Sequence, residues 1–340
     1  MFGSLTRRVV RHNGICAFRP TVAQSGRHAS TETPRQHVAY EEALKLIQTD
    51  KKERLQMLSQ VEKELVRVCK ATSPAQPAQL QALEALRYDL LVKSELNDPQ
   101  VQKDYKLGKV DMGRPVYRYM RQREFQKVPR AKLMERITQM NVIPDVLAPG
   151  LSPKVEVSIK LADEQSVVEP GVFVQPEQTV KKPEIEITNF HTDTRLYTLM
   201  LVDPDSPDVA NQTYQQHCHW LITNVPLSAT EPIVNAGDSV LDYVPPHPQK
   251  GTKYHRYTLV AFEQPKEGQE KVEIKVTNRD NFDIKTLAET HNLSVSGASF
   301  FRQEWNPSVS KIYEDVLGTQ EPVYGKPPKV QNYIKRTTYF

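Results

Sequence analysis

Residues 199–208 read LMLVDPDSPD, four apolar residues that run directly into aspartates set between prolines. The apolar residues are typical of a buried β-strand. After them Pro204 and Pro207 fix the backbone φ angle, and the side chains of Asp203 and Asp205 can accept hydrogen bonds from nearby backbone N–H groups. The stretch therefore predicts a strand that ends in a stiff turn carrying two carboxylates.

Similar segments lie on both sides of this stretch. From residue 151 apolar and polar residues alternate in short segments bounded by Pro, Gly, Asn or Asp, which are 155–161, EIEI (184–187), LYTLMLV (196–202), CHWLITNV (218–225), RYTLVAF (256–262) and KVEIKV (271–276). Consecutive strands without intervening helices predict a mainly β domain, an antiparallel β-sandwich, over 151–321. Two helices near 283–291 and 307–317 are expected to close it.

A helical extension is expected over residues 32–101, before the β domain. Apolar residues recur at three- and four-residue spacing from about 35 to 70 and again from 80 to 96, with the breaker ATSPAQPAQ (71–79) between them. These patterns predict a helical hairpin. Two such helices bury too little apolar area to be stable alone, so the hairpin should lean on another part of the chain or on a partner.

The formal net charge of +4 is unevenly distributed. Residues 102–136 carry +7 and the basic tail 322–340 carries +4, whereas residues 137–321 carry −11. Residues 1–31 contain five Arg and no acid, and they can place apolar side chains opposite Arg on a helix. This composition is typical of a mitochondrial presequence, which predicts a protein of the mitochondrial matrix. A basic arm that stays on the mature protein is the alternative.

Residues 102–150 form an expected basic, aromatic linker that binds RNA or protein. Lys and Arg interleaved with Tyr and Phe suit an RNA surface, because cations neutralise phosphates and flat side chains stack on unpaired bases. A merely solvated basic linker has the same local composition. The candidate RNA-binding residues, including two in the tail, are Arg114, Arg118, Arg121, Arg123, Lys127, Arg130, Lys132, Lys335 and Arg336.

Other whole-chain features exclude several classes of protein. No run approaches the roughly 18 consecutive apolar residues that a membrane span requires. The three cysteines, Cys16, Cys69 and Cys218, lack metal-ligand spacing, and their odd number argues against a disulfide framework. We expect reduced thiols.

Polar side chains follow three of the expected strands. Asp203 and Asp205 end one strand, His219 lies at the start of the next, and His255 and Tyr257 begin a third. If these strands are neighbours in one sheet, the side chains converge at one rim, where they could form a metal site, an acid–base site or an anion pocket. No pair has the spacing of known metal motifs, and no Ser or Cys lies in a recognisable nucleophile elbow, so neither metal ligands nor catalytic residues are expected.

The run LMLVDPDSPD (199–208), with HCHWLITNVP (217–226) and GTKYHRYTLVAFEQ (251–264), closely resembles the phosphatidylethanolamine-binding protein family, over about 155–317. The resemblance implies two antiparallel sheets and a rim pocket for a phosphate or phospholipid head group. The implied pocket residues are Asp203, Asp205, Pro207, Tyr214, His219, His255 and Tyr257. The chain departs from the family at His247 and Lys253, where members carry glycine, so the pocket is expected to be vestigial.

The order of presequence, basic helical extension, sandwich and basic tail is similar to that of mitochondrial ribosomal proteins with such a domain. This implies a non-catalytic structural constituent of the large subunit, without a cofactor. Its partners would be ribosomal RNA and neighbouring ribosomal proteins, with the acidic sandwich facing protein. The alternative is a free mitochondrial protein of this family that binds phospholipid or another anion, or that inhibits a kinase or protease. An enzyme is a more distant alternative.

Overall fold

The computed structural model describes residues 38–70, 76–162 and 166–325. The expected presequence, and most of the basic tail with Lys335 and Arg336, lie outside the described residues. The chain divides into two units, Met1–Leu46 and Ile47–Phe340, and the described part of the first is the beginning of one helix. The packing of the sheets and of the shorter helices lies within the second unit.

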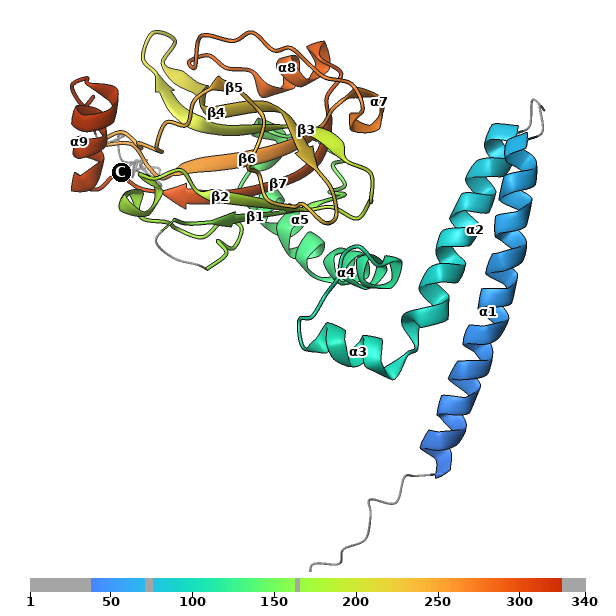
Figure 1. Cartoon of the computed structure of the whole chain (residues 1–340). Helices are drawn as coiled ribbons and strands as arrows, with labels where there is room; N and C mark the ends of the chain where they lie inside the picture. The colour runs from blue at the N-terminus through green and yellow to red at the C-terminus, as the bar shows by residue number, and fades with distance from the viewer. Residues whose placement is uncertain (1–37, 71–75, 163–165, 326–340) are drawn as a thin grey trace, which may run out of the picture. The chain divides into compact units, whose positions relative to one another are not determined.

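Two long helices, α1 (Val38–Lys70) and α2 (Gln76–Leu96), come first among the described residues (Figure 1). They pack through an apolar cluster whose buried members are Leu58, Val61 and Leu90. The expected helical hairpin is confirmed, although α2 begins inside the stretch expected to separate the helices. So small a cluster supports the hairpin weakly, since most helix stability in proteins comes from a packed apolar face.

Four shorter helices follow, α3 (Pro99–Lys106), α4 (Pro115–Lys127), α5 (Pro129–Gln139) and α6 (Val142–Asp145). The first two lie where the sequence shows no apolar stripe, whereas α5 matches the short helix that the sequence predicts near 130–140. The first three each begin at a proline, a residue suited to the first helical position because the N–H it lacks would have no partner there. Helix α4 buries Val116, Tyr117 and Phe125 between cations. Because this apolar face is short and interleaved with charge, the sequence pattern does not reveal it.

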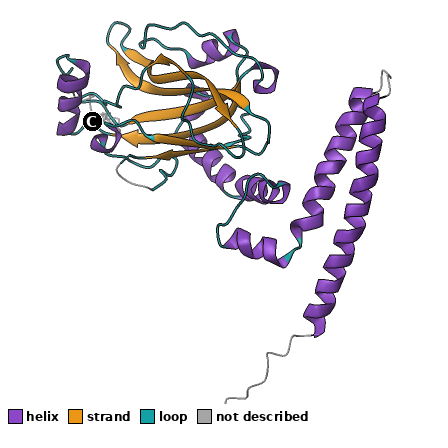
Figure 2. Ribbon diagram, viewed as in Figure 1, coloured by secondary structure: helices purple, strands orange, loops and turns teal. Residues whose placement is uncertain are grey.

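The β domain consists of a two-stranded and a five-stranded sheet, both antiparallel (Figure 2). The order in the larger sheet is β5-β4-β3-β6-β7, and the smaller sheet pairs β1 with β2. The strands are β1 (Glu156–Lys160), β2 (Glu184–Thr188), β3 (Arg195–Asp208), β4 (Thr213–Leu227), β5 (Asp238–Leu241), β6 (His255–Glu263) and β7 (Ser294–Gln303). The expected mainly β architecture is confirmed.

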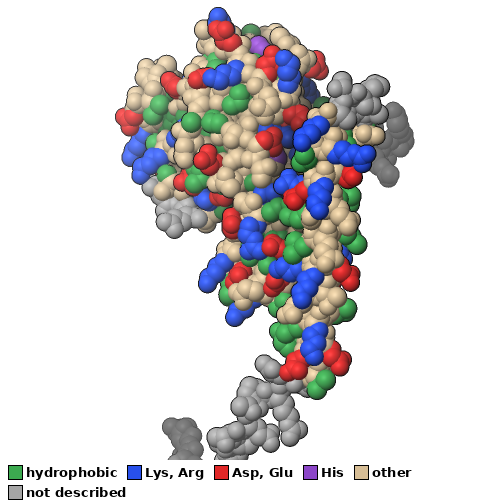
Figure 3. Space-filling view, turned by 45° about the vertical axis from the view of Figure 1, so that its right-hand side comes forward, with side chains coloured by type: hydrophobic (Ala, Val, Ile, Leu, Met, Phe, Trp, Pro, Cys, Tyr) green, Lys and Arg blue, Asp and Glu red, His purple; other side chains and the backbone are tan. Residues whose placement is uncertain are grey.

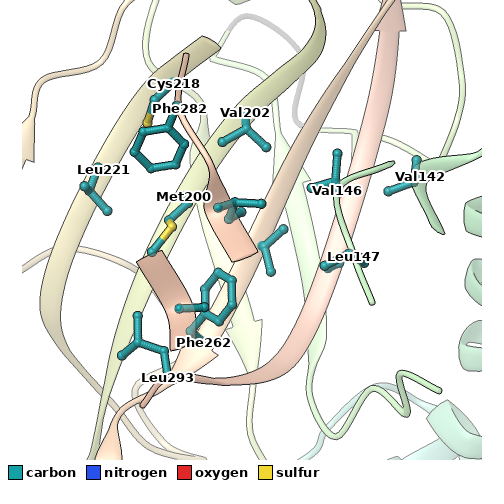
Figure 4. Close-up of a cluster of buried hydrophobic side chains, with 14 of the residues drawn as sticks. Val142, Val146, Leu147, Met200, Val202, Cys218, Leu221, Phe262, Phe282 and Leu293 are labelled. Carbon is teal, nitrogen blue, oxygen red and sulfur yellow. The ribbon is translucent and has the colours of Figure 1, made fainter. Parts of the chain in front are cut away.

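The central strand β3 is buried on both faces, which explains why its sequence runs LMLV instead of alternating. Leu199 and Leu201 join a cluster shared with β1 and β2. Met200 and Val202 join a second cluster on the opposite face, drawn in Figure 4. The larger sheet therefore separates two apolar layers.

Helices that precede the expected boundary at residue 151 contribute to the second of these layers. Leu133 and Ile137 of α5, Val142 of α6, and Val146 and Leu147 after it are buried in that cluster. The apolar core of the β domain therefore begins within the segment that the sequence indicates as a linker.

Three details differ from the sequence-based expectation. KVEIKV (271–276) is not a strand, although Val272 and Ile274 are buried, because these residues lie against the apolar layer outside the sheet ladders. Strands β5 and β7 were not expected.

The two late helices are confirmed as α8 (Ile284–Thr290) and α9 (Pro307–Ile312), the latter continued by a π-helical turn, Tyr313–Leu317. A short turn, η1 (Pro176–Thr179), and α7 (Pro265–Gly268) complete the elements.

Candidate functional site

The candidate site lies on three adjacent strands. Strand β3 pairs with β4 on one side and with β6 on the other, so Asp203, His219 and His255 are carried by neighbours in one sheet. The relative exposure of each of these three side chains is 2% or less. Tyr214 does not join this buried group, because it is 66% exposed near the far end of β4 and is paired in register with Pro207.

Asp203 forms a buried ion pair. Its Oδ2 lies 2.7 Å from His255 Nδ1, and its Oδ1 accepts a hydrogen bond of 2.9 Å from the backbone N–H of Asp205. Burial alone would lower the pKa of His255, but the adjacent Asp203 carboxylate raises it above its ordinary value. The carboxylate thus holds both a turn and an imidazole.

Asp205 is bound by Arg256, which the sequence analysis did not identify. The backbone N–H, Nε and Nη2 of Arg256 donate to the Asp205 carboxylate at 2.9, 2.8 and 2.7 Å. Nη1 donates to the Met140 carbonyl at 2.7 Å, and Nη2 lies 2.8 Å from Asp145. Arg256 therefore ties the helical segment to the sheet, and a bidentate pair of this kind is geometrically specific.

Three imidazoles pack together next to the Asp203 pair. The ring centroid of His219 lies 4.8 Å from His217, 5.0 Å from His247 and 5.2 Å from Tyr257. His219 Nδ1 is 3.1 Å from the Val244 carbonyl oxygen, and as this oxygen only accepts, that nitrogen carries the proton. Burial, and then the neighbouring His217 and His247, lower the pKa of His219 well below its ordinary value.

His247 occupies the centre of the site. It is 8% exposed, and its ring also packs against Tyr313 at 5.3 Å between centroids. Its Nδ1 lies 2.7 Å from the Pro245 carbonyl oxygen. Burial lowers the pKa of His247 to about 4. At neutral pH the ring is an uncharged side chain that fills space.

Several buried polar atoms around the imidazoles lack hydrogen-bond partners among the described residues, namely Tyr257 Oη, Gln249 Oε1 and His217 Nε2. Burial raises the pKa of Tyr257 well above its ordinary value, so the phenol stays neutral. These unpaired atoms show that the site is lined by polar groups although it is buried from solvent. Outside it lies a hollow of about 290 Å³, lined among others by Asp205, Tyr214 and Lys253.

The candidate RNA-binding cations fall into two groups. Three have partners within the chain, since Arg114 and Arg121 pair with carboxylates and Arg118 donates to the carbonyls of Met112 and Gly113, at 2.9 Å each. Arg118 is only 5% exposed, which leaves its guanidinium little surface for a contact with RNA. Of the others, Arg123, Lys127 and Lys132 are exposed and Arg130 is partly exposed. Figure 3 shows Lys and Arg interspersed with Asp and Glu on one face of the molecule.

Metal and membrane features were also sought in the described ranges. These residues contain no cluster of three or more His, Cys, Asp or Glu side chains placed to hold a metal ion. None of the described helices combines the length and apolar composition needed to cross a bilayer.

The imidazole cluster should make the fold sensitive to acid. The folded-state pKa of His247, about 4, lies below the ordinary 6.5, so its contribution to stability is complete above pH 6.5 and falls as the pH drops toward 4. His219 acts in the same direction. The stabilisation from His255 has the opposite sign, because its raised pKa makes that contribution complete below pH 6.5 and lost at higher pH.

Urea unfolding at pH 7 and pH 5 measures this effect. Between the two, we expect the wild type to lose about 2 kcal/mol more unfolding free energy than His247→Phe, which fills the same space without titrating. Equal losses in the two proteins would show that His247 is not kept neutral by the fold.

Comparisons with known proteins agree in part of the chain. A family model described as phosphatidylethanolamine-binding protein matches residues 160–300. Protein FLOWERING LOCUS T of Arabidopsis thaliana is 32% identical over 161 residues, which are 47% of this chain and 85% of that protein. Carboxypeptidase Y inhibitor, solved with its cognate proteinase, covers 53% of this chain and 99% of its own, at 20% identity and a TM-score of 0.46.

One relative is similar over most of the chain. The large ribosomal subunit protein mL38 of Schizosaccharomyces pombe is 26% identical over 289 residues, which are 84% of this chain and 89% of that protein. This similarity is about twice as long as the family-model match and therefore includes much of the chain outside the β domain.

Proposed function

This chain belongs to the phosphatidylethanolamine-binding protein family, and we propose that it is a structural constituent of the large subunit of the mitochondrial ribosome. The observation that carries the proposal is the similarity to the ribosomal protein mL38 over 84% of this chain. A protein that shared only the β domain would not be expected to match the extension as well. The Arg-rich residues 1–31 support import into the mitochondrial matrix.

The geometry of the candidate site supports a role without ligand or catalysis. Asp205 is bound by Arg256, Asp203 by His255, and the space beside His219 is taken by the ring of His247. These are the positions that a phosphate or phospholipid head group would need. We interpret the site as a vestigial anion pocket, retained because its ion pairs hold β3, β6 and the preceding helices together.

Attachment to ribosomal RNA is assigned to the basic segments. Arg123, Lys127, Arg130 and Lys132 are at least partly exposed on α4 and α5. Each Lys or Arg that neutralises a phosphate releases counterions and adds salt-sensitive affinity. The basic tail, with Lys335 and Arg336, adds cations at the other end, and neighbouring large-subunit proteins are the partners for the acidic body.

Co-sedimentation of mitochondrial extract at moderate salt tests the proposal. The wild-type chain should migrate with the large subunit. The variant Arg123→Glu/Lys127→Glu/Lys132→Glu should lose about tenfold or more in affinity and shift toward the top of the gradient, because phosphate contacts become repulsive. The matched control Lys266→Glu/Lys271→Glu/Lys275→Glu changes the net charge equally on exposed residues elsewhere and should remain with the subunit.

Two outcomes would contradict this assignment. A wild-type chain that stays at the top of the gradient would favour the free, anion-binding alternative. A control that dissociates as readily as the α4–α5 variant would show that total charge, rather than this surface, governs attachment.

A further inference from the structure

Aromatic and cationic side chains gather on the loops that flank the start of β6 and the end of β7. We propose that this surface, the aromatic patch, binds an unpaired segment of RNA. It consists of Phe173, Lys250, Lys253, Tyr254, Arg302 and Trp305. The inference rests on the proposed function and adds to it, since the acidic β domain then contributes its own contact to RNA.

The rings and cations of the patch are already stacked on each other. The guanidinium of Arg302 lies 4.0 Å from the ring centroid of Phe173 and 5.2 Å from that of Tyr254. The two rings meet edge to face at 5.9 Å. On the other side, the ammonium of Lys250 lies 4.6 Å from the Trp305 ring. Rings held in place in this way lose little further freedom when a flat partner stacks on them.

The rings nevertheless remain open to solvent and border hollows. Phe173 is 45% exposed and Tyr254 is 36% exposed. A hollow of about 330 Å³ lies between Tyr254 and Trp305, and a second of about 210 Å³ lies between Trp305 and Phe173. Exposed aromatic side chains beside such hollows suit the flat faces of nucleobases, because stacking on a ring contributes about 1–3 kcal/mol per base whatever the sequence.

The local charge selects an anionic partner. Lys250 and Lys253 are exposed, and Nε of Arg302 donates to the Gly171 carbonyl at 2.8 Å. Within the described residues, the other two nitrogens of Arg302 have no hydrogen-bond partner and can reach a phosphate. Glu304 is the acidic residue that lines both hollows. The patch therefore has positive charge on a domain that is acidic as a whole.

The course of the chain brings the described start of the C-terminal tail to the same place. The backbone N–H of Tyr324 donates to the Lys250 carbonyl at 2.8 Å, and Val323 pairs with Lys250 in a parallel bridge. Glu321 is fixed by Ser310 at 2.6 Å and by the indole N–H of Trp305. Residues 326–340, which follow at once, contain four Lys or Arg and no acid. The basic tail thus starts at the aromatic patch.

Gly251 is required for this arrangement. Its φ of +91° is rarely adopted by residues with a side chain, and a Cβ there would overlap the carbonyl oxygen of Tyr324. The chain therefore keeps a glycine where the C-terminal segment crosses the loop. The cations of the patch and its stacked rings together favour unpaired RNA over an acidic peptide, since such a peptide would use the charge but not the rings.

Fluorescence anisotropy with the purified full chain tests the inference. The probes are a labelled single-stranded oligouridylate and an RNA hairpin whose stem has the same number of phosphates. We expect Lys253→Ala/Tyr254→Ala to lower the affinity for the single strand about tenfold, with a salt dependence reduced by about one unit. The affinity for the hairpin should fall only by the smaller effect of one cation.

Controls separate stacking from folding and from charge. Lys253→Arg/Tyr254→Phe keeps the cation and the ring and should bind as the wild type does. Ile233→Ala/Lys275→Ala removes an exposed apolar side chain and a cation elsewhere and should leave the single-strand affinity unchanged. Gly251→Ala should also weaken single-strand binding, although it removes no side chain from the patch, because it displaces the start of the tail.

Several outcomes would overturn the inference. They are an unchanged single-strand affinity in Lys253→Ala/Tyr254→Ala, an equal loss for the hairpin, or binding to phosphatidylserine vesicles that depends on the patch while RNA binding does not. The double variant is also run in the co-sedimentation experiment. If the wild type joins the large subunit while the patch variant binds RNA normally, only this inference fails. If the patch binds RNA but the wild type does not sediment, the proposed function fails instead.

Discussion

Replacement of Asp203 by alanine should lower the free energy of unfolding by about 3–5 kcal/mol, the cost of removing one partner from a buried ion pair. Asp203 and His255 are 2% and 1% exposed, so the imidazole would be left without its carboxylate and without water. The turn would also lose the acceptor for the backbone N–H of Asp205. Urea unfolding at pH 7 measures the loss.

Two further variants separate the effect of the charge from that of the hydrogen bond and from that of removing any carboxylate. Asp203→Asn keeps an acceptor for the turn and removes only the charge, so its loss should be smaller than that of the alanine variant. Asp315→Ala removes an exposed carboxylate in the π-helical turn and should leave stability nearly unchanged. If Asp203→Ala is as stable as the wild type, the ion pair does not support the fold. If a folded Asp203→Ala chain selectively fails to join the large subunit, the carboxylate has a functional role and the scaffold interpretation is wrong.

The sequence predicts that Asp203 and His255 lie near each other, but it does not predict that they pair. The alternating segments and their bounding turns predict the antiparallel sheets, and the order β4-β3-β6 then brings Asp203, His219 and His255 together. What the pattern does not give is the partner of each group. Arg256 follows a histidine within a strand, and only the packing of α6 and the preceding turn, with Met140 and Asp145, shows that it is buried.

The alternation of apolar and polar residues predicts a strand wrongly where side chains are buried but the backbone does not pair with another strand. In KVEIKV (271–276) alternate side chains are buried, as in a strand, yet the backbone of Val272 donates to the side chain of Asn224 at 3.0 Å instead of to a neighbouring strand. In helix α4 the sequence misleads in the opposite way. Tyr117 and Phe125 are buried, but because they lie among cations in the sequence they resemble an exposed RNA-binding surface. The same mixture of cations and aromatic residues supplies both buried and exposed side chains. Only tertiary packing shows that Arg118 is buried and Arg123 is exposed.

The His247 side chain should be what closes the vestigial anion pocket, and His247→Gly should therefore reopen it. Removing the ring vacates the space between His217, His219 and Tyr313. The Tyr257 hydroxyl, which lacks a hydrogen-bond partner among the described residues, could then donate to an anion in that space. We expect the variant to bind inorganic phosphate at least tenfold more tightly than the wild type.

The same change should destabilise the free protein by about 2–5 kcal/mol, as large-to-small substitutions in a core do. Phosphate should restore part of this loss, because a ligand at a hundred times its Kd adds about 2.7 kcal/mol to stability. Isothermal titration and phosphate-dependent thermal unfolding measure the two effects. If the glycine variant does not fold, His247→Ala gives the same test through the dependence of its Tm on phosphate.

His247→Phe is the matched control, since it fills the same space with a ring that neither titrates nor donates a hydrogen bond. It should bind no phosphate. If the wild type binds phosphate as tightly as His247→Gly, the pocket is open and the free, anion-binding alternative gains support. If neither His247→Gly nor His247→Ala binds phosphate, the residues around His219 have lost the geometry for an anion as well as the space, because Arg256 is already paired with Asp205 and His255 with Asp203.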